Sequence, residues 1–295
     1  MATVGQWISG ARLRTLPMAV APVIIGTAAA YDLGELHWGR AVLAALVALL
    51  LQIGVNYAND YSDGIRGTDE VRVGPLRLVG SGVAKPSHVK MAAFAMFALA
   101  MLAGLGLVLA SQAWWLILVG TGAVLAAWGY TGGKNPYGYM GLGDVFVFVF
   151  FGPVATLGTT FTQAGSVSTA AVLGSISTGL IAVALLMANN VRDIPTDTEV
   201  GKRTLAVRLG DKNARLSYVL MLALSVVLML FIAPAKPWIL LVLLLIPFML
   251  MPSWLMLKGK KRKSLIPVLQ QTGLLNLGFS VLFAAAMVLT ALLGQ

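Results

Sequence analysis

Residues 41–63 read AVLAALVALLLQIGVNYANDYSD, an apolar run that ends in amides and carboxylates. A helix needs about 20 mostly apolar residues to cross the hydrocarbon core of a membrane, and the run over 40–58 has that length. If the helix continues beyond the run, Asn56, Asp60 and Asp63 share one face, because they are spaced i, i+4, i+7. The segment therefore predicts a membrane-spanning helix that carries an acidic stripe to one membrane surface.

The rest of the chain repeats this apolar pattern. Of its 295 residues, 58% are hydrophobic and 11% are charged, whereas soluble domains carry about 25% charged residues. We therefore expect an all-α integral membrane protein, a single domain over 1–295 that forms a bundle of nine transmembrane helices. The candidate spans are 15–31, 40–58, 88–110, 113–131, 143–163, 168–190, 215–233, 237–257 and 271–292.

Lysine and arginine are distributed unevenly between the connecting loops. With a cytoplasmic N-terminus, nineteen of the 21 Lys and Arg residues fall on the cytoplasmic side, and only Arg40 and Lys236 fall on the other. This bias predicts a multi-pass protein of the cell membrane with its C-terminus outside. The net charge of +10 then indicates lipid and phosphate partners and no nucleic acid. The first span also has the flanks of a signal peptide, although we prefer a retained helix.

The acidic residues are even more concentrated, and other reactive types are scarce. The chain has no cysteine and two histidines, which excludes thiolate chemistry and disfavours a His-rich metal site. It also has no Walker-type phosphate loop. The rule that sets the orientation of a protein in the membrane concerns Lys and Arg, and it does not explain why acidic residues cluster. Eight of the eleven acids lie in two cytoplasmic segments: Asp60, Asp63, Asp69, Glu70, Asp193, Asp197, Glu199 and Asp211.

The second acidic segment repeats the design of the first. Asn189, Asp193 and Asp197 are spaced i, i+4, i+8 and share a face if the helix tolerates Pro195. Carboxylates this close repel each other at the rim of a membrane bundle unless a cation neutralises them. Hard oxygen ligands suit Mg²⁺, which completes its shell with water and substrate phosphate. Together the two segments predict a diphosphate clamp that acts through Mg²⁺, with active-site loops on the cytoplasmic side.

Basic residues near the same rim are predicted to contact phosphate oxygens, because Arg binds them bidentately and Lys as a point charge. Such contacts would stabilise departing pyrophosphate, and we place Lys134 and Arg192 among the catalytic residues. Asp144 is predicted either to orient a ligand or to cap the helix that begins beside it. The basic residues are Arg66, Arg72, Arg77, Lys134, Arg192, Lys202, Arg203 and Arg208.

Two other interpretations of the acidic segments stay open. They could be solvated loops in which Asp–Arg pairs serve only solubility and topology. They could also belong to a cation-coupled transporter, but transporter sites usually lie near the bilayer midplane. Here the span centres carry no charge and the acids lie at one edge. Two matched clusters on one side favour chemistry at the membrane surface.

Several segments resemble the UbiA-type family of intramembrane prenyltransferases over nearly the whole chain. The family's first motif is Asn-Asp-x-x-Asp-x-x-x-Asp; Asn59, Asp60 and Asp63 match it, but Asp69 comes two positions late. This wider spacing resembles the form of the motif in the family branch that acts on 1,4-dihydroxy-2-naphthoate. The other similar segments are Arg14-Thr15-Leu16-Pro17, Gly74-Pro75-Leu76-Arg77, KNPYGYMGLGD over 134–144 and NNVRDIPTDTEVGKRTL over 189–205.

The resemblance implies transfer of a polyprenyl group from polyprenyl diphosphate to 1,4-dihydroxy-2-naphthoate, with loss of CO₂ and diphosphate, to give demethylmenaquinone. Hydroxybenzoate and homogentisate are the alternative acceptors. The implied Mg²⁺ ligands are Asp60, Asp63, Asp193 and Asp197, with Asp69 as a further candidate. Asn56, Asn59 and Asn189 would help to bind substrate. Tyrosines near the rim would shield an allylic cation by cation–π contact, although interfacial tyrosines are also plain membrane anchors: Tyr57, Tyr61, Tyr130, Tyr137 and Tyr139.

Overall fold

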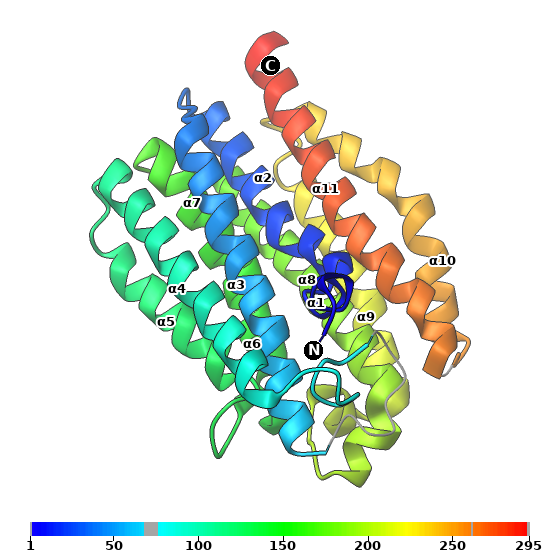
Figure 1. Ribbon diagram of the computed structural model, residues 1–295. Coiled ribbons are helices and arrows are strands. Elements are labelled where there is room, and N and C mark those ends of the chain that lie inside the picture. Colours follow the sequence, from blue (N-terminus) through cyan, green and yellow to red (C-terminus); the bar gives the residue numbers. More distant parts are fainter. Residues whose placement is uncertain (1, 68–75, 261, 294–295) are drawn as a thin grey trace.

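Helices make up most of the molecule, and most of them run side by side along one common direction (Figure 1). The computed structural model describes residues 2–67, 76–260 and 262–293, and these ranges contain no β-strand. The helices are α1 (Val4–Gly10), α2 (Leu16–Asp32), α3 (Trp38–Ile65), α4 (Pro86–Ser111), α5 (Leu116–Gly129), α6 (Gly143–Val149), α7 (Ala155–Ala164), α8 (Thr169–Glu199), α9 (Leu205–Leu230), α10 (Ile246–Leu257) and α11 (Ile266–Leu293).

The prediction of a membrane-spanning bundle is confirmed in its main part. Within the described ranges, eight helical segments are long and apolar enough to cross a membrane. The remaining predicted span, 113–131, corresponds to α5, which has only 14 residues. The seventh span was predicted to begin at 215, whereas α9 begins at Leu205 and is kinked at Gly210, whose φ of +74° and ψ of +160° are not helical. Arg208, Asp211 and Lys212 interrupt the apolar run, so hydropathy alone places the start of this helix too late.

The predicted span 143–163 has an internal irregularity. α6 passes into a π-helix over Phe150–Val154, and α7 follows it. Pro153 lies inside this turn and has no N–H to donate, and a π-turn is a common way to absorb such a local break in the α-helical pattern. Gly152 lets the turn approach α8 closely, because a Cβ there would lie 2.6 Å from the carbonyl oxygen of Ser175.

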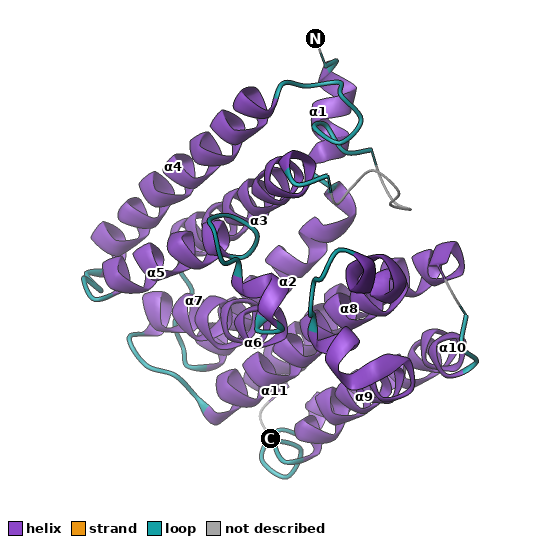
Figure 2. Ribbon diagram, turned by 90° about the horizontal axis from the view of Figure 1, so that it is seen from below, coloured by secondary structure: helices purple, strands orange, loops and turns teal. Residues whose placement is uncertain are grey.

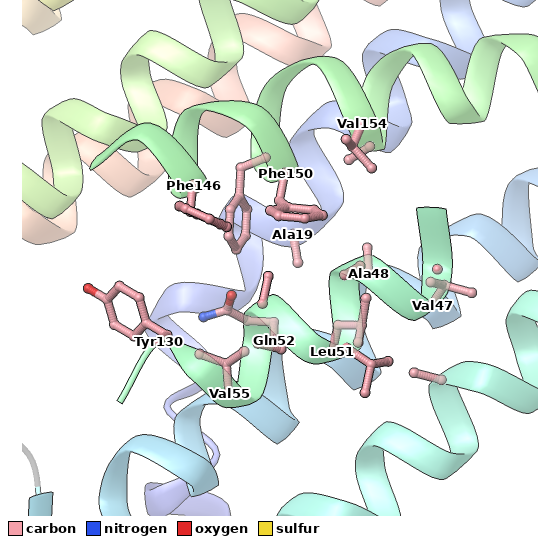
Figure 3. Close-up of a pocket in the computed structure, with 18 of the residues that line it drawn as sticks. Ala19, Val47, Ala48, Leu51, Gln52, Val55, Tyr130, Phe146, Phe150 and Val154 are labelled. Atoms are coloured by element: carbon pink, nitrogen blue, oxygen red, sulfur yellow. The ribbon is translucent and has the colours of Figure 1, made fainter. Parts of the chain in front are cut away.

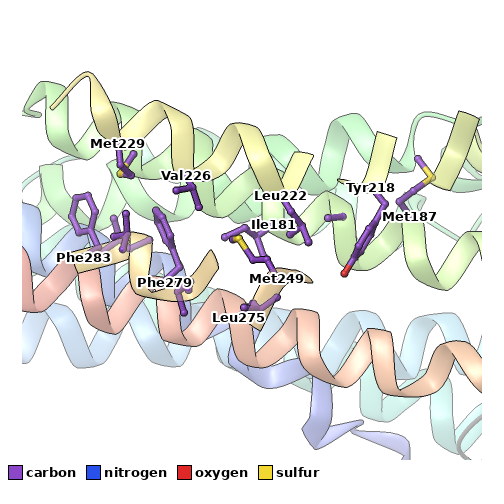
Figure 4. Close-up of a cluster of buried hydrophobic side chains, with 14 of the residues drawn as sticks. Ile181, Met187, Tyr218, Leu222, Val226, Met229, Met249, Leu275, Phe279 and Phe283 are labelled. Atoms are coloured by element: carbon purple, nitrogen blue, oxygen red, sulfur yellow. The ribbon is translucent and has the colours of Figure 1, made fainter. Parts of the chain in front are cut away.

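The largest apolar core lies between α8, α9, α10 and α11 (Figure 4). Ile181 of α8, Leu222 of α9 and Phe279 of α11 are almost fully buried in it. The hydroxyls of Tyr218 and Thr272 lie 2.6 Å apart and link α9 to α11 within this core. Helices in lipid associate through such packing and through hydrogen bonds between them. The core therefore supports α8, which carries the second acidic stripe.

A second close contact joins α2 to α7 at Gly26. A Cβ at this position would lie 2.4 Å from the carbonyl oxygen of Thr156 and 2.7 Å from the Cβ of Thr159. The hydroxyl of Thr160 donates to the carbonyl of Gly26 at 3.0 Å, so the two helices are also joined by a hydrogen bond. Small residues at helix contacts in membranes permit this close approach of backbones.

Replacing Gly26 with alanine should lower the stability of the folded protein, because α2 and α7 must separate to admit the methyl group. Overpacking of this kind costs about 1–3 kcal/mol. The measurement is the melting temperature of the protein purified in detergent. Gly122→Ala in α5 is the matched control, since a Cβ there meets nothing within 4 Å. An equal melting temperature for both variants would show that the α2–α7 contact can relax without loss.

Candidate active site

A cavity of about 800 Å³ lies between α2, α3, α4, α5, the α6–α7 segment and α8 (Figure 3). α3 contributes apolar residues to one part of its lining, including Val47, Ala48 and Leu51, and polar residues to another. Within the described residues, α9, α10 and α11 contribute nothing to this lining. A cavity with these two parts fits a ligand that has a charged head and a long apolar body. The polar and charged lining residues are Arg12, Thr15, Gln52, Asn56, Asn59, Asp63, Arg77, Thr121, Tyr130, Thr131, Tyr137, Thr159, Thr162, Asn189, Asn190 and Lys202.

The two acidic helices, α3 and α8, end at the same end of the bundle, which is the lower end in Figure 1 and the near end in Figure 2. Side-chain contacts join them there through Tyr139, from the connection between α5 and α6. Its hydroxyl donates to Asp63 at 2.7 Å, and the ammonium group of Lys202 lies 4.9 Å from the centre of its ring. Lys202 in turn lies 3.7 Å from a carboxylate oxygen of Asp197. The ends of the two stripes therefore meet in one site.

The remaining acid of the second stripe, Asp193, pairs with its neighbour in sequence. The guanidinium of Arg192 donates to both carboxylate oxygens of Asp193, at 2.7 and 2.6 Å, and also to Asn189 at 2.8 Å. Both side chains of the ion pair are buried. A buried carboxylate needs such a partner, because an isolated charge in this environment would be costly. Arg192 therefore orients both Asp193 and Asn189.

The first stripe contains residues that hold the backbone in place. Asp60 accepts hydrogen bonds from the backbone N–H groups of Leu78 and Val79, at 2.8 and 3.0 Å. These bonds hold the segment that precedes α4 against α3. Asn56 donates to the carbonyl of Ala11 at 2.9 Å, and Asn59 accepts from the hydroxyl of Thr131 at 2.7 Å. Arg77 directly precedes Leu78 in the chain, and its guanidinium lies 4.0 Å from a carboxylate oxygen of Asp63.

Other predicted residues do not line the cavity themselves. Arg66 donates to the carbonyls of Thr131 and Gly133, at 2.5 and 2.6 Å, and so fastens the connection between α5 and α6. Tyr61 stacks on Trp128, with 6.1 Å between the ring centres, and it does not line the cavity. Among the described residues, four of the basic side chains predicted at the rim are exposed: Arg66, Lys134, Arg203 and Arg208.

Asp144 lies in the first turn of α6 and is buried there, outside the cavity lining. One of its carboxylate oxygens has no hydrogen-bond partner among the described residues. Its position at a helix N-terminus is favourable for a negative charge, although no side-chain cap is formed. Two predicted residues, Asp69 and Arg72, lie outside the described residues, as do Gly74 and Pro75.

Aromatic side chains form one wall of the cavity beside the polar part (Figure 3). Tyr137 stacks on Phe146 with 4.0 Å between ring centres, and Tyr130 meets Tyr137 edge-on at 5.6 Å. The hydroxyl of Tyr137 donates to the carbonyl of Ala126 at 2.8 Å, and burial raises the pKa of this hydroxyl above its ordinary value. The tyrosine therefore stays neutral. Phe150 continues the wall from the π-turn.

The carboxylates near the cavity fit a metal that arrives with other ligands. Among the described residues, no three Asp, Glu or His side chains gather closely enough to hold a metal by themselves. Mg²⁺ usually takes one or two carboxylates and fills its shell with water and substrate phosphates. Of the predicted carboxylates, Asp63 lines the cavity and offers a hard oxygen donor of this kind, whereas Asp193, Asp197 and both histidines lie outside the lining.

This chain belongs to the UbiA prenyltransferase family, whose sequence profile matches residues 19–275. A 1,4-dihydroxy-2-naphthoate octaprenyltransferase from Mycobacterium tuberculosis is 51% identical over 287 residues, which cover 97% of this chain and 98% of that protein. The protein of the same name from Escherichia coli is 44% identical over 216 residues, covering 71% and 70%. The family resemblance inferred from the motifs is thereby confirmed.

Solved structures agree on the fold. A UbiA homologue from Archaeoglobus fulgidus bound to GPP and Mg²⁺ superimposes with a TM-score of 0.68, at 15% sequence identity, and the match covers 96% of this chain and 99% of that chain. A UbiA homologue from Aeropyrum pernix gives a TM-score of 0.66 at 16% identity, covering 99% and 100%. At these identities the likeness concerns the arrangement of the helices.

Proposed function

We propose that this protein transfers a polyprenyl group from polyprenyl diphosphate to 1,4-dihydroxy-2-naphthoate, with loss of CO₂ and diphosphate, and so forms demethylmenaquinone in its reduced, dihydroxy (quinol) form. The observation that carries the proposal is the meeting of two acidic stripes beside an apolar cavity, at Asp63, Tyr139, Lys202 and Asp197. The name of the relative that is 51% identical over nearly the whole chain supports the choice of acceptor. The whole of 1–295 would form one catalytic domain.

The diphosphate would bind at the polar end of the cavity. Asp63, Asp193 and Asp197 would hold Mg²⁺ together with the diphosphate, with Asp60 and Asp69 as further ligands, and bound Mg²⁺ would neutralise the charge that develops as the C–O bond breaks. Lys202 and Arg77 both line this end and would contact phosphate oxygens directly. The Mg²⁺ bound with GPP in the Archaeoglobus structure supports a divalent metal here.

The prenyl chain would lie in the apolar part of the cavity, along α3 and against α2, α4 and α5. The carbon that becomes cationic would then lie between this part and the diphosphate, beside the aromatic wall. Tyr130 and Phe146 present ring faces or edges to the cavity (Figure 3), and a cation over an aromatic ring is stabilised by its negative face. The walls also exclude water, which would otherwise trap the cation as an alcohol.

The proposed topology has nine spans, with α5 as a short crossing, a cytoplasmic N-terminus and an external C-terminus in the cell membrane. The active site would then face the cytoplasm, since the connections after α3, α5 and α8 lie at one end of the bundle. The excess of Lys and Arg in these connections supports this orientation. Charged diphosphate would enter from the aqueous side, and the apolar chain would enter from the membrane.

The choice of acceptor can be tested with purified protein in lipid vesicles and one polyprenyl diphosphate. We expect product from 1,4-dihydroxy-2-naphthoate, with the mass of a prenylated ring that has lost its carboxyl group, and release of pyrophosphate and CO₂ in equal amounts. 4-Hydroxybenzoate and homogentisate, offered in parallel, should give little or no product. A product from one of these acceptors alone would assign the chain to another reaction of the same family, and cation uptake without any product would contradict the enzyme assignment.

A further inference from the structure

Arg12 has an unusual backbone conformation for its residue type. Its φ is +54° and its ψ is +60°, which is the left-handed region that favours glycine. In the described residues it shares a positive φ with only one other non-glycine residue, Gln112. A bulky residue held in this region signals strain that the surroundings must maintain, and such strain is often found at functional sites.

Three side chains hold this conformation in place. The carbonyl of Arg12 accepts from both the backbone N–H and the hydroxyl of Thr15, at 2.8 and 2.9 Å. The oxygen of the same hydroxyl accepts from the amides of Gln52 and Asn56, each at 3.1 Å. Gln52 and Asn56 lie one turn apart on α3. The network therefore fixes the backbone of Arg12 against the helix that carries the first acidic stripe, and Asn56 acts as a positioning residue.

The guanidinium group itself has no such partner. Among the described residues it makes no hydrogen bond and no ion pair, and its Nη2 atom is buried. The Oε1 atom of Gln52 is likewise buried without a hydrogen-bond partner. Both residues line the cavity, and Gln52 is drawn at its wall in Figure 3. Buried polar groups of native proteins are nearly always paired, so a donor and an acceptor left open together in a cavity indicate a ligand.

The position of this pair along α3 indicates which part of the substrates it meets. Asn56 lies seven residues before Asp63, which is about 10 Å along a helix, and Gln52 lies one further turn into the apolar part. Arg12 is thus held near the boundary between the acidic end of the cavity and its apolar body. In the proposed reaction this boundary is where the prenyl carbon leaves the diphosphate and where the acceptor ring must approach it.

We propose that Arg12 binds the carboxylate of the aromatic acceptor and that Gln52 accepts a hydrogen bond from one of its ring hydroxyls. This inference rests on the proposed function. A carboxylate brought into this cavity needs a cation that the diphosphate site does not already use, and Arg12 is the unpaired one among the described lining residues. The product has no carboxylate, so loss of CO₂ removes the group that Arg12 holds and favours release of a neutral lipid.

The test compares wild type with Arg12→Gln and Arg12→Lys in vesicles. We expect Arg12→Gln to raise the KM for 1,4-dihydroxy-2-naphthoate by about 10- to 100-fold, the effect of losing a charge-assisted hydrogen bond. The KM for the prenyl diphosphate and the inhibition constant of Mg²⁺-pyrophosphate should change by less than about twofold. Arg12→Lys keeps the charge and should restore part of the acceptor affinity. Lys85→Gln, which removes an exposed charge outside the cavity, is the matched control and should leave both KM values unchanged.

A binding measurement separates the role of the carboxylate from any effect on turnover. 1,4-Dihydroxy-2-naphthoate should raise the melting temperature of wild type more than 1,4-dihydroxynaphthalene does, and Arg12→Gln should abolish this difference. Arg12→Gly relieves the left-handed strain, so it should fold at least as stably as wild type while losing the same discrimination. This variant covers the case in which Arg12→Gln does not fold.

The outcomes distinguish the inference from the function on which it rests. If wild type forms no product from 1,4-dihydroxy-2-naphthoate, the proposed function fails. If wild type is active but Arg12→Gln raises the KM for the prenyl diphosphate or the pyrophosphate inhibition constant as much as that of the acceptor, Arg12 serves the diphosphate and the inference is wrong. Unchanged acceptor affinity in both Arg12→Gln and Arg12→Gly would also overturn it.

Discussion

Asp63→Asn should lower kcat/KM by a factor on the order of 10³ while leaving the protein folded. The amide is nearly isosteric, and its oxygen can still accept the hydroxyl of Tyr139, which now lies 2.7 Å from the carboxylate. What is lost is the negative charge that would hold Mg²⁺ and the diphosphate on this side of the cavity. Asp63 is a cleaner choice than Asp193, because Asp193→Asn would also leave the buried guanidinium of Arg192 without its ionic partner.

The measurement is single-turnover prenyl transfer at saturating acceptor, with the melting temperature in detergent as the check on folding. Glu199→Gln serves as the control, because Glu199 lies at the end of the same acidic segment but is exposed and outside the cavity. If Asp63→Asn turns over at the rate of Glu199→Gln, Asp63 has no part in holding the diphosphate. The proposed metal clamp would then be wrong even if the reaction itself is correct.

Removing divalent cations with EDTA should abolish prenyl transfer, to below about 1% of the original rate, and added Mg²⁺ should restore it. The carboxylates of Asp63, Asp193 and Asp197 would repel a diphosphate that approached without a neutralising cation. Lys202 and Arg77 alone cannot balance both sets of charges. Rates should be compared at constant ionic strength, so that general screening does not imitate the effect.

The control for this experiment is EDTA saturated with Mg²⁺ before it is added, which should leave the rate unchanged. The melting temperature of the chelated protein shows whether the loss reflects binding or unfolding. Sustained turnover in the chelated sample would contradict a mechanism in which a divalent cation helps the diphosphate to leave.

The sequence was informative wherever one local segment carries the signal. Apolar length located the spans, and spacing placed Asp63 and Asp197 on stripes that the structure brings to one site. Charge near the rim was less informative, because it does not separate substrate contacts from structural ones. Arg66 was predicted to bind phosphate, yet its guanidinium is hydrogen-bonded to backbone carbonyls of a neighbouring connection.

The missed features depend on tertiary structure. Arg12, Phe146 and Phe150 become part of the cavity only because distant helices fold around it, and no local pattern marks them. Gln52 is different: it lies four residues before Asn56 and extends the polar stripe of α3 by one turn, so the same periodicity that found the stripe could have included it. The left-handed backbone of Arg12 has no counterpart in composition or hydropathy.

The π-turn at Phe150–Val154 limits where insertions and deletions can be tolerated in this chain. Each residue of an α-helix advances the side chains by about 100°. Deleting one residue from the turn would therefore rotate α7 relative to α6, and Thr156 and Thr159 would leave Gly26 if Phe146 kept its place. The π-turn therefore fixes the position of the aromatic wall of the cavity relative to the α2–α7 contact. Insertions and deletions should be tolerated in the surface connections, whereas the number of residues from Phe146 to Thr159 should be fixed.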